Sequence, residues 1–93
     1  MSKPIKENKI SKEEVISKIK DILSDQLGVD IKKITLDSNL VEDLGMDSFK
    51  AVEIIFQIKE HFEIQLPERD FLNKISKVRE IVNYVWKGKK AKK

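Results

Sequence analysis

The sequence predicts an all-α fold, in the form of a four-helix bundle with a long first loop and a short third helix. Four segments carry apolar residues at helical spacing, and each opens with a residue type that commonly begins a helix. The stretch at Ile34, Leu36 and Ser38 alternates as a strand does, but no second segment is suited to pair with it. The 93 residues, 40% of them hydrophobic, suffice for one domain with a modest core.

The first predicted helix spans residues 11–27. Ser11 and Glu14 have the spacing of a capping box, in which each side chain accepts a hydrogen bond from the backbone of the other residue. Gly28 is placed to end the helix in a left-handed conformation. The spacing predicts that one buried stripe is formed by Val15, Ile16, Ile19, Ile22, Leu23 and Leu27.

A long connection, residues 29–46, follows the first helix. Loops of this length without regular structure are uncommon in compact domains and are often functional. A short turn of helix is expected near residues 31–36. Apolar residues recur along the connection and are expected to pin it across the bundle: Val29, Ile31, Ile34, Leu36, Leu40 and Leu44.

The second predicted helix, residues 48–61, follows Gly45, whose missing Cβ permits a left-handed turn. Asp47 and Ser48 are both good helix-capping types, so one is expected to cap the helix and to leave the other free. A free Ser48 hydroxyl would face solvent at the positive end of the helix dipole. That position favours negative charge by roughly 0.3–1 kcal/mol.

Apolar side chains cover an arc of about 220° around this helix at 100° per residue, against roughly 100° for an ordinary surface helix. The helix is therefore expected to be buried on several sides. Two interpretations remain open: a central helix contacted by three others, or a pocket between helices that admits an alkyl chain. The residues expected to line such a pocket are Val52, Ile55, Phe56, Ile58, Phe62, Phe71 and Leu72.

Two further helices complete the prediction. Pro67 is expected to open the short third helix, because its fixed φ suits a first helical turn. Ser76 is expected to cap the fourth helix. Phe71, Leu72 and Ile75 are the predicted anchors of the third helix, and the fourth carries an apolar stripe at Val78, Ile81, Val82 and Val85.

Charge is distributed unevenly along the chain, whose formal net charge is +3. Residues 1–36 carry +2, residues 37–76 carry −5 and residues 77–93 carry +6. We expect a disordered segment at 1–10, a folded domain at 11–86 and a basic lysine tail at 87–93, with Gly88 breaking the helix. This tail is either a solvated end or an electrostatic arm for an acidic partner.

No catalytic or metal-binding constellation is apparent. The chain has no cysteine, which excludes disulfides and a cysteine nucleophile. The single histidine, His61, has no serine or acid at a spacing that would build a triad. Glu42, Asp43 and Asp47 form an acidic group for which capping and partner recognition are favoured over weak cation binding. No run approaches the roughly 20 apolar residues of a membrane span, and no signal peptide is expected.

Asp47-Ser48-Phe49 resembles the Asp-Ser-Leu signature of acyl carrier proteins, and residues 41–45 resemble the run that precedes it. The resemblance covers nearly all of residues 11–86. It implies that Ser48 bears a 4′-phosphopantetheine arm, attached covalently from coenzyme A, with Asp47 and Phe49 beside it. The other matching segments, in the same order, are Gln26-Leu27-Gly28-Val29, Val52-Glu53 and Ile64-Gln65-Leu66-Pro67.

The resemblance also implies a partner surface, and here the sequence departs from the family. Acyl carrier proteins generally present an acidic second helix to basic enzymes, whereas Lys50, Lys59 and His61 stand at or near positions where acids are common. Charge complementarity chiefly governs association rate and partner choice, which suggests a dedicated pathway. The residues expected to meet partners are Glu42, Asp43, Asp47, Lys50, Glu53, Gln57 and Glu60.

The function implied is transport of acyl intermediates as thioesters, for fatty acid, lipid or polyketide-like biosynthesis, without catalysis by the chain itself. Expected partners are a phosphopantetheinyl transferase and acyl-transfer or condensing enzymes, with no nucleic acid. A cytoplasmic monomer is expected. One alternative is an aminoacyl or peptidyl carrier with the same arm. Another is an unmodified helical interaction module that uses its basic tail.

Overall fold

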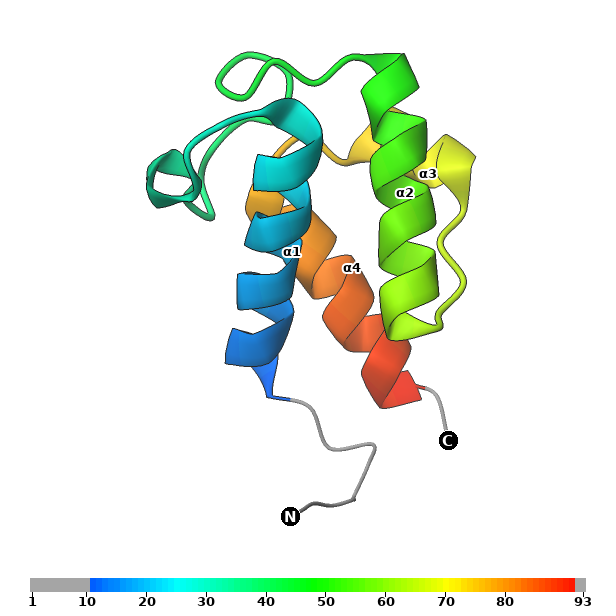
Figure 1. Ribbon diagram of the computed structural model, residues 1–93. Helices are drawn as coiled ribbons and strands as arrows, with labels where there is room; N and C mark the ends of the chain where they lie inside the picture. Colours follow the sequence, from blue (N-terminus) through cyan, green and yellow to red (C-terminus); the bar gives the residue numbers. More distant parts are fainter. Residues whose placement is uncertain (1–10, 92–93) are drawn as a thin grey trace.

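The computed structural model describes residues 11–91, and within them the side chains of 68, 70, 72 and 89–91 are left out. These residues form an all-α fold (Figure 1), as the sequence predicts. The described helices are α1 (Lys12–Leu27), the 3₁₀ helix η1 (Ile31–Lys33), α2 (Ser48–Phe62), α3 (Glu68–Lys74) and α4 (Val78–Ala91). Helix α1 packs against both α2 and α4, and α2 also packs against α3. The segment 1–10, expected to be disordered, lies outside the described residues.

Helix α1 begins and ends as predicted. The Ser11 hydroxyl accepts a hydrogen bond from the Glu14 N–H at 3.1 Å, and the Glu14 carboxylate accepts one from the Ser11 N–H at 3.0 Å. Gly28 ends the helix in the left-handed region, at φ 68°, and its N–H donates to the Ser24 carbonyl. Both ends of α1 are thus set by local hydrogen bonds.

The long connection is held against the bundle, as expected, although Ile31 is 38% exposed rather than buried. Its main anchor is the segment between α3 and α4. The Leu40 N–H donates to the Ser76 carbonyl at 2.8 Å, and the Val78 N–H donates to the Ser38 carbonyl at 3.1 Å. An isolated antiparallel bridge joins residues 39 and 77, and the described residues form no strand. The predicted turn of helix near residues 31–36 is η1.

The same junction carries an ion pair across the sequence. The Arg79 guanidinium donates to the Asp37 carboxylate, and the Arg79 N–H donates to the Leu36 carbonyl at 2.9 Å. These contacts join the middle of the connection to the first turn of α4. The position of the connection is therefore defined by backbone and charged groups as well as by its buried apolar side chains.

The prediction that the apolar arc of α2 is buried on several sides is wrong on one side. Neighbouring elements cover the side that carries Ala51, Ile54, Ile55, Ile58 and Phe62, all of which are buried. Three apolar residues remain exposed, because their spacing of i, i+3 and i+7 places them together on the outer side: Phe49 at 71%, Val52 at 41% and Phe56 at 58%.

Helices α3 and α4 differ from the prediction in two details. Pro67 precedes α3 as expected, but the first residue of α4 is Val78, and Ser76 does not cap it in the expected way. Instead, the Glu80 carboxylate accepts hydrogen bonds from the N–H of Ser76 at 2.6 Å and of Lys77 at 3.1 Å. An acidic side chain in the first turn thus binds the N–H groups of the two residues that precede α4.

Gly88 does not break the fourth helix, because α4 runs on to Ala91. A Cβ at position 88 would lie 3.5 Å from the Ile64 side chain, so the glycine lies close against the loop that follows α2. That distance is ordinary van der Waals contact, so an alanine would fit, and the packing does not account for a glycine inside the helix, where it costs roughly 1 kcal/mol relative to alanine. The first part of the predicted tail is therefore helical, and residues 92–93 lie outside the described residues.

Candidate functional site

The start of α2 is the centre of the candidate site. Asp47 is the N-cap residue, and its carboxylate accepts a hydrogen bond from the Lys50 N–H at 2.8 Å. Ser48 is the first residue of the helix and is exposed. Among the described residues, no hydrogen bond engages the Ser48 hydroxyl. Asp47 therefore provides the cap and leaves the Ser48 hydroxyl accessible, which decides between the two capping alternatives that the sequence left open.

A compact turn positions this helix start. The Asn39 side-chain oxygen accepts hydrogen bonds from the N–H of Val41 at 3.0 Å and of Glu42 at 2.8 Å, and the Asp43 carboxylate accepts one from the Asn39 N–H at 2.8 Å. Gly45 then takes φ 78°, a conformation that favours glycine. Asn39 is a positioning residue that sequence reasoning missed, although asparagine at the start of a turn is a recognised signal.

The predicted partner-recognition residues lie around this turn and along α2. Glu42, Asp43 and Asp47 are exposed, and the carboxylates of Asp43 and Asp47 already accept backbone hydrogen bonds. Lys50 and Glu53 form an ion pair at 3.6 Å on the helix surface. Gln57 and Glu60 are exposed further along the helix. Residues 11–91 contain no group of three or more acids or histidines arranged to hold a metal ion.

An exposed apolar patch, formed by Phe49, Val52 and Phe56, lies on the same helix as Ser48. Sequence reasoning assigned these residues to the apolar arc and expected their burial. Helical spacing alone could not separate these residues from the buried ones, because a wide apolar arc is typical of a helix that several neighbours cover. Large exposed apolar side chains of this kind commonly mark a surface that another group covers.

The residues predicted to line an acyl pocket are not gathered around one cavity. Ile55, Ile58, Phe62 and Phe71 are buried in the closed core, whereas Val52 and Phe56 lie on the outer side of α2. The remaining member, Leu72, has a side chain outside the described part of the structure. A chain entering the core would therefore have to displace side chains that now pack against one another.

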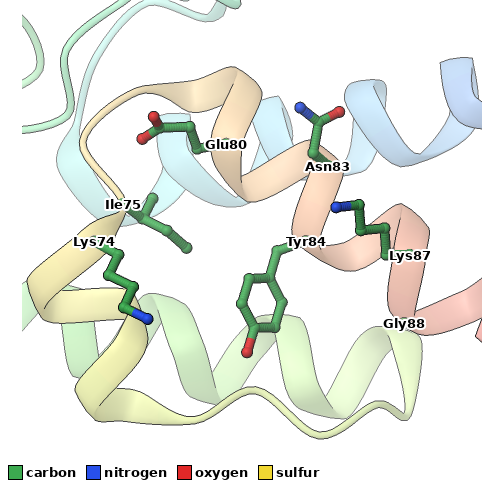
Figure 2. Close-up of a pocket in the computed structure, with 7 residues that line it drawn as sticks. All are labelled: Lys74, Ile75, Glu80, Asn83, Tyr84, Lys87 and Gly88. Atoms are coloured by element: carbon green, nitrogen blue, oxygen red, sulfur yellow. The ribbon is translucent and has the colours of Figure 1, made fainter.

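A cavity between α3 and α4 has a volume of about 530 Å³. Figure 2 shows the side chains of Lys74 and Lys87 approaching it from the two helices, with the Tyr84 ring between them. None of its lining residues comes from α2 or from the turn before it. This cavity is therefore separate from the candidate site at Ser48.

The surroundings of Ser48 fit a covalently attached phosphate ester. The hydroxyl is exposed, and the first intrahelical bond runs from the Ala51 N–H to the Asp47 carbonyl at 2.8 Å. The N–H groups of Ser48 and Phe49 precede that bond, so they have no partner within the helix. Free N–H groups at the positive end of a helix stabilise an anionic group there.

The described residues are all-α, with an accessible serine at the start of a helix, and this arrangement fits a protein of the class that carries a phosphopantetheine arm. In agreement, the sequence profile of the phosphopantetheine attachment site family matches residues 17–85. The acyl carrier protein of Clostridium acetobutylicum is 42% identical over 71 residues, which cover 76% of this chain and 91% of that protein. The acyl carrier protein of Thermotoga maritima is 40% identical over 77 residues (83% and 94%), and that of Guillardia theta is 37% identical over 76 residues (82% and 93%).

The chain belongs to the acyl carrier protein family. Members of this family carry a covalently attached 4′-phosphopantetheine and act as carriers rather than as enzymes. Family membership also implies that the chain meets a transferase and biosynthetic enzymes. Within residues 11–91, no helix has the length and apolar character needed to span a membrane.

Proposed function

We propose that Ser48 is the attachment site of the arm and that the chain carries acyl groups as thioesters on it. The observation that carries this proposal is the pairing of roles at the start of α2. Asp47 satisfies the Lys50 N–H at 2.8 Å, and the adjacent Ser48 hydroxyl is left exposed and without a hydrogen bond among the described residues. Asp47 and Phe49 then flank the attachment point.

The attachment chemistry requires little from the chain beyond an accessible hydroxyl. The Ser48 oxygen forms a new bond to phosphorus while the phosphoanhydride bond of coenzyme A breaks. The leaving group is 3′,5′-ADP, and the hydroxyl proton passes to a base of the transferase. When attached, the group supplies a flexible arm with a terminal thiol, which the cysteine-free chain lacks. The residues of this chain contribute position and charge stabilisation only.

We further propose that the cargo belongs to fatty acid, lipid or polyketide-like biosynthesis, in a dedicated pathway served by a cytoplasmic monomer that binds no nucleic acid. The charge of α2 supports the dedicated pathway, because Lys50 pairs with Glu53 at 3.6 Å and offsets an acid that a basic partner would otherwise meet. The proposed partner surface consists of seven exposed or half-buried polar residues: Glu42, Asp43, Asp47, Lys50, Glu53, Gln57 and Glu60. Acyl groups released from thioesters of the purified protein would support this proposal. Aminoacyl groups would contradict it and favour an aminoacyl or peptidyl carrier.

The arrangement of the helices and the place of the acyl chain are also inferred. We infer a four-helix bundle with a short third helix as the arrangement of the carrier domain at residues 11–86. An acyl chain within the bundle would lie among Ile55, Ile58, Phe62 and Phe71, which form the core beneath α2. That core is closed in the structure, so loading a long chain requires the buried side chains to separate.

The intact mass of the protein tests the attachment site directly. Incubation with coenzyme A and a broad-specificity phosphopantetheinyl transferase is expected to add one phosphopantetheine to the wild type and none to Ser48→Ala. Ser17→Ala is the matched control, because Ser17 is another exposed helical serine and its loss leaves the site intact. A folded wild type that gains no mass would remove the proposal and favour the unmodified interaction module.

A further inference from the structure

A shallow surface trough lies beside α2 on the side of α1. Its lining residues are Gln26 of α1 and four residues of α2, namely Val52, Glu53, Phe56 and Gln57, and its volume is about 420 Å³. It adjoins a second depression between α1 and α2, of about 210 Å³, which shares Gln26 and Gln57 with it. The larger depression, the trough, contains two of the exposed apolar side chains of α2.

The trough is aligned with Ser48 along the helix. Val52 and Phe56 follow Ser48 at i+4 and i+8, so around the helix axis Val52 is turned from Ser48 by about 40° and Phe56 by about 80°. At a rise of 1.5 Å per residue, Val52 lies about 6 Å and Phe56 about 12 Å along the axis from Ser48. A flexible group attached to the Ser48 oxygen therefore has a direct path along the trough.

The length of the arm matches this path. Beyond its phosphorus, the phosphopantetheine arm is a chain of about a dozen atoms, which at the extended-chain spacing of roughly 3.3–3.6 Å per three atoms reaches about 14 Å. That reach ends near Phe56 and Gln57. The arm can therefore reach the side chains of the trough without entering the closed core.

The chemistry of the trough matches the arm as well. The arm has a geminal dimethyl group and two amides, and the trough offers the apolar surfaces of Val52 and Phe56 together with the side-chain amides of Gln26 and Gln57. Among the described residues, no hydrogen bond engages either glutamine amide. Each amide offers both a donor and an acceptor, as an amide partner requires. Glu53 is paired with Lys50 at 3.6 Å, which moderates its charge beside the neutral part of the arm.

We propose that, when no partner is bound, the arm lies in this trough and covers Val52 and Phe56. The proposal rests on Ser48 being the attachment site. The two exposed apolar side chains are then covered by a group that belongs to the same molecule. An enzyme that contacts this side of α2 would displace the arm, so that docking and presentation of the thiol become one event.

Because the chain has no cysteine, a maleimide spin label added to the modified protein attaches only to the thiol of the arm. Intact mass first establishes that one arm and one label are present. In two-dimensional nuclear magnetic resonance spectra, the amide signals of Gln26, Val52, Phe56 and Gln57 are expected to lose most of their intensity, and to recover it when the label is reduced. Signals of Ile75 and Tyr84, at the other cavity, are expected to change little.

Substitutions in the trough test whether Val52 and Phe56 hold the arm. The double variant Val52→Ala/Phe56→Ala, modified to the same extent, is expected to lose the selective broadening, whereas Ile31→Ala, which removes a partly exposed apolar side chain elsewhere, is expected to keep it. Broadening in the wild type that is uniform, or centred on Ile75 and Tyr84, would overturn the proposal while leaving Ser48 as the attachment site. A wild type without the added mass would remove both proposals together.

Discussion

At the scale of single residues, the site depends on two adjacent side chains that could exchange roles. Asp47 and Ser48 both cap helices well, and the structure gives the cap to Asp47 at 2.8 Å from the Lys50 N–H. The carboxylate contributes more than a hydroxyl at this position, because its negative charge also interacts with the helix dipole. Ser48 is therefore free of a structural role in the described residues and remains available for modification.

The division of roles predicts different stability effects for the two residues. Asp47→Ala is expected to lower the free energy of unfolding by about 1 kcal/mol, because the cap is lost. Ser48→Ala removes an exposed hydroxyl and is expected to change it by less than about 0.5 kcal/mol. Urea denaturation of the two variants and the wild type measures both values. A loss for Ser48→Ala as large as that for Asp47→Ala would mean that Ser48 acts as the cap.

At the scale of elements, the junction between the long connection and α4 holds in place the segment that leads to Ser48. The Asp37 carboxylate pairs with Arg79, which lowers the pKa of Asp37 through hydrogen bonding and the nearby positive charge. The Glu80 carboxylate accepts hydrogen bonds from the N–H of Ser76 and Lys77, which lowers the pKa of Glu80. Both groups therefore favour the folded state when ionised.

Stability should therefore depend on pH through this junction. A carboxyl whose pKa is lowered by folding contributes stability above its unfolded pKa and loses it as pH falls through its folded pKa. Wild type is expected to be more stable than Glu80→Gln at pH 7, and the difference is expected to shrink as pH falls below about 4. Denaturation at a series of pH values measures it. A difference that is independent of pH would exclude this account.

At the scale of the whole molecule, the same residue type serves opposite purposes on the two sides of the fold. Phe71 is fully buried in the core, whereas Phe49 is 71% exposed beside the site. A chain of 93 residues has a total stability of roughly 5–14 kcal/mol, so one well-packed phenylalanine is a large share of it. The exposed phenylalanine contributes little to the fold and is available for contacts outside it.

The two phenylalanines provide a matched test of this arrangement. Phe71→Ala is expected to lower the free energy of unfolding by about 3–5 kcal/mol, because it leaves a cavity in the core. Phe49→Ala is expected to change it by less than about 1 kcal/mol. Thermal denaturation followed by circular dichroism distinguishes the two. Similar losses in both variants would show that the outer side of α2 is packed in solution.

Much of the fold and of the site could be predicted from the sequence, because the signals concerned act over three or four residues. The capping box at Ser11 and Glu14, the left-handed Gly28 and Gly45, and the alternatives for Asp47 and Ser48 are of this kind. Hydrogen bonds between such close neighbours depend on residue types a few positions apart, so they can be predicted without knowing which elements pack together. The family resemblance likewise rests on short motifs, four of which match in the same order and spacing along the chain.

The tertiary structure alone decided which side of α2 is covered and where the long connection is anchored. Val52 and Ile55 are both apolar and both lie in the predicted arc, yet Ile55 is buried whereas Val52 is 41% exposed. Likewise, the pairing of Asp37 with Arg79 joins residues 42 positions apart, and α4 continues through Gly88 to Ala91. The physical reason is that burial depends on which elements pack together, and that depends on contacts between distant parts of the chain.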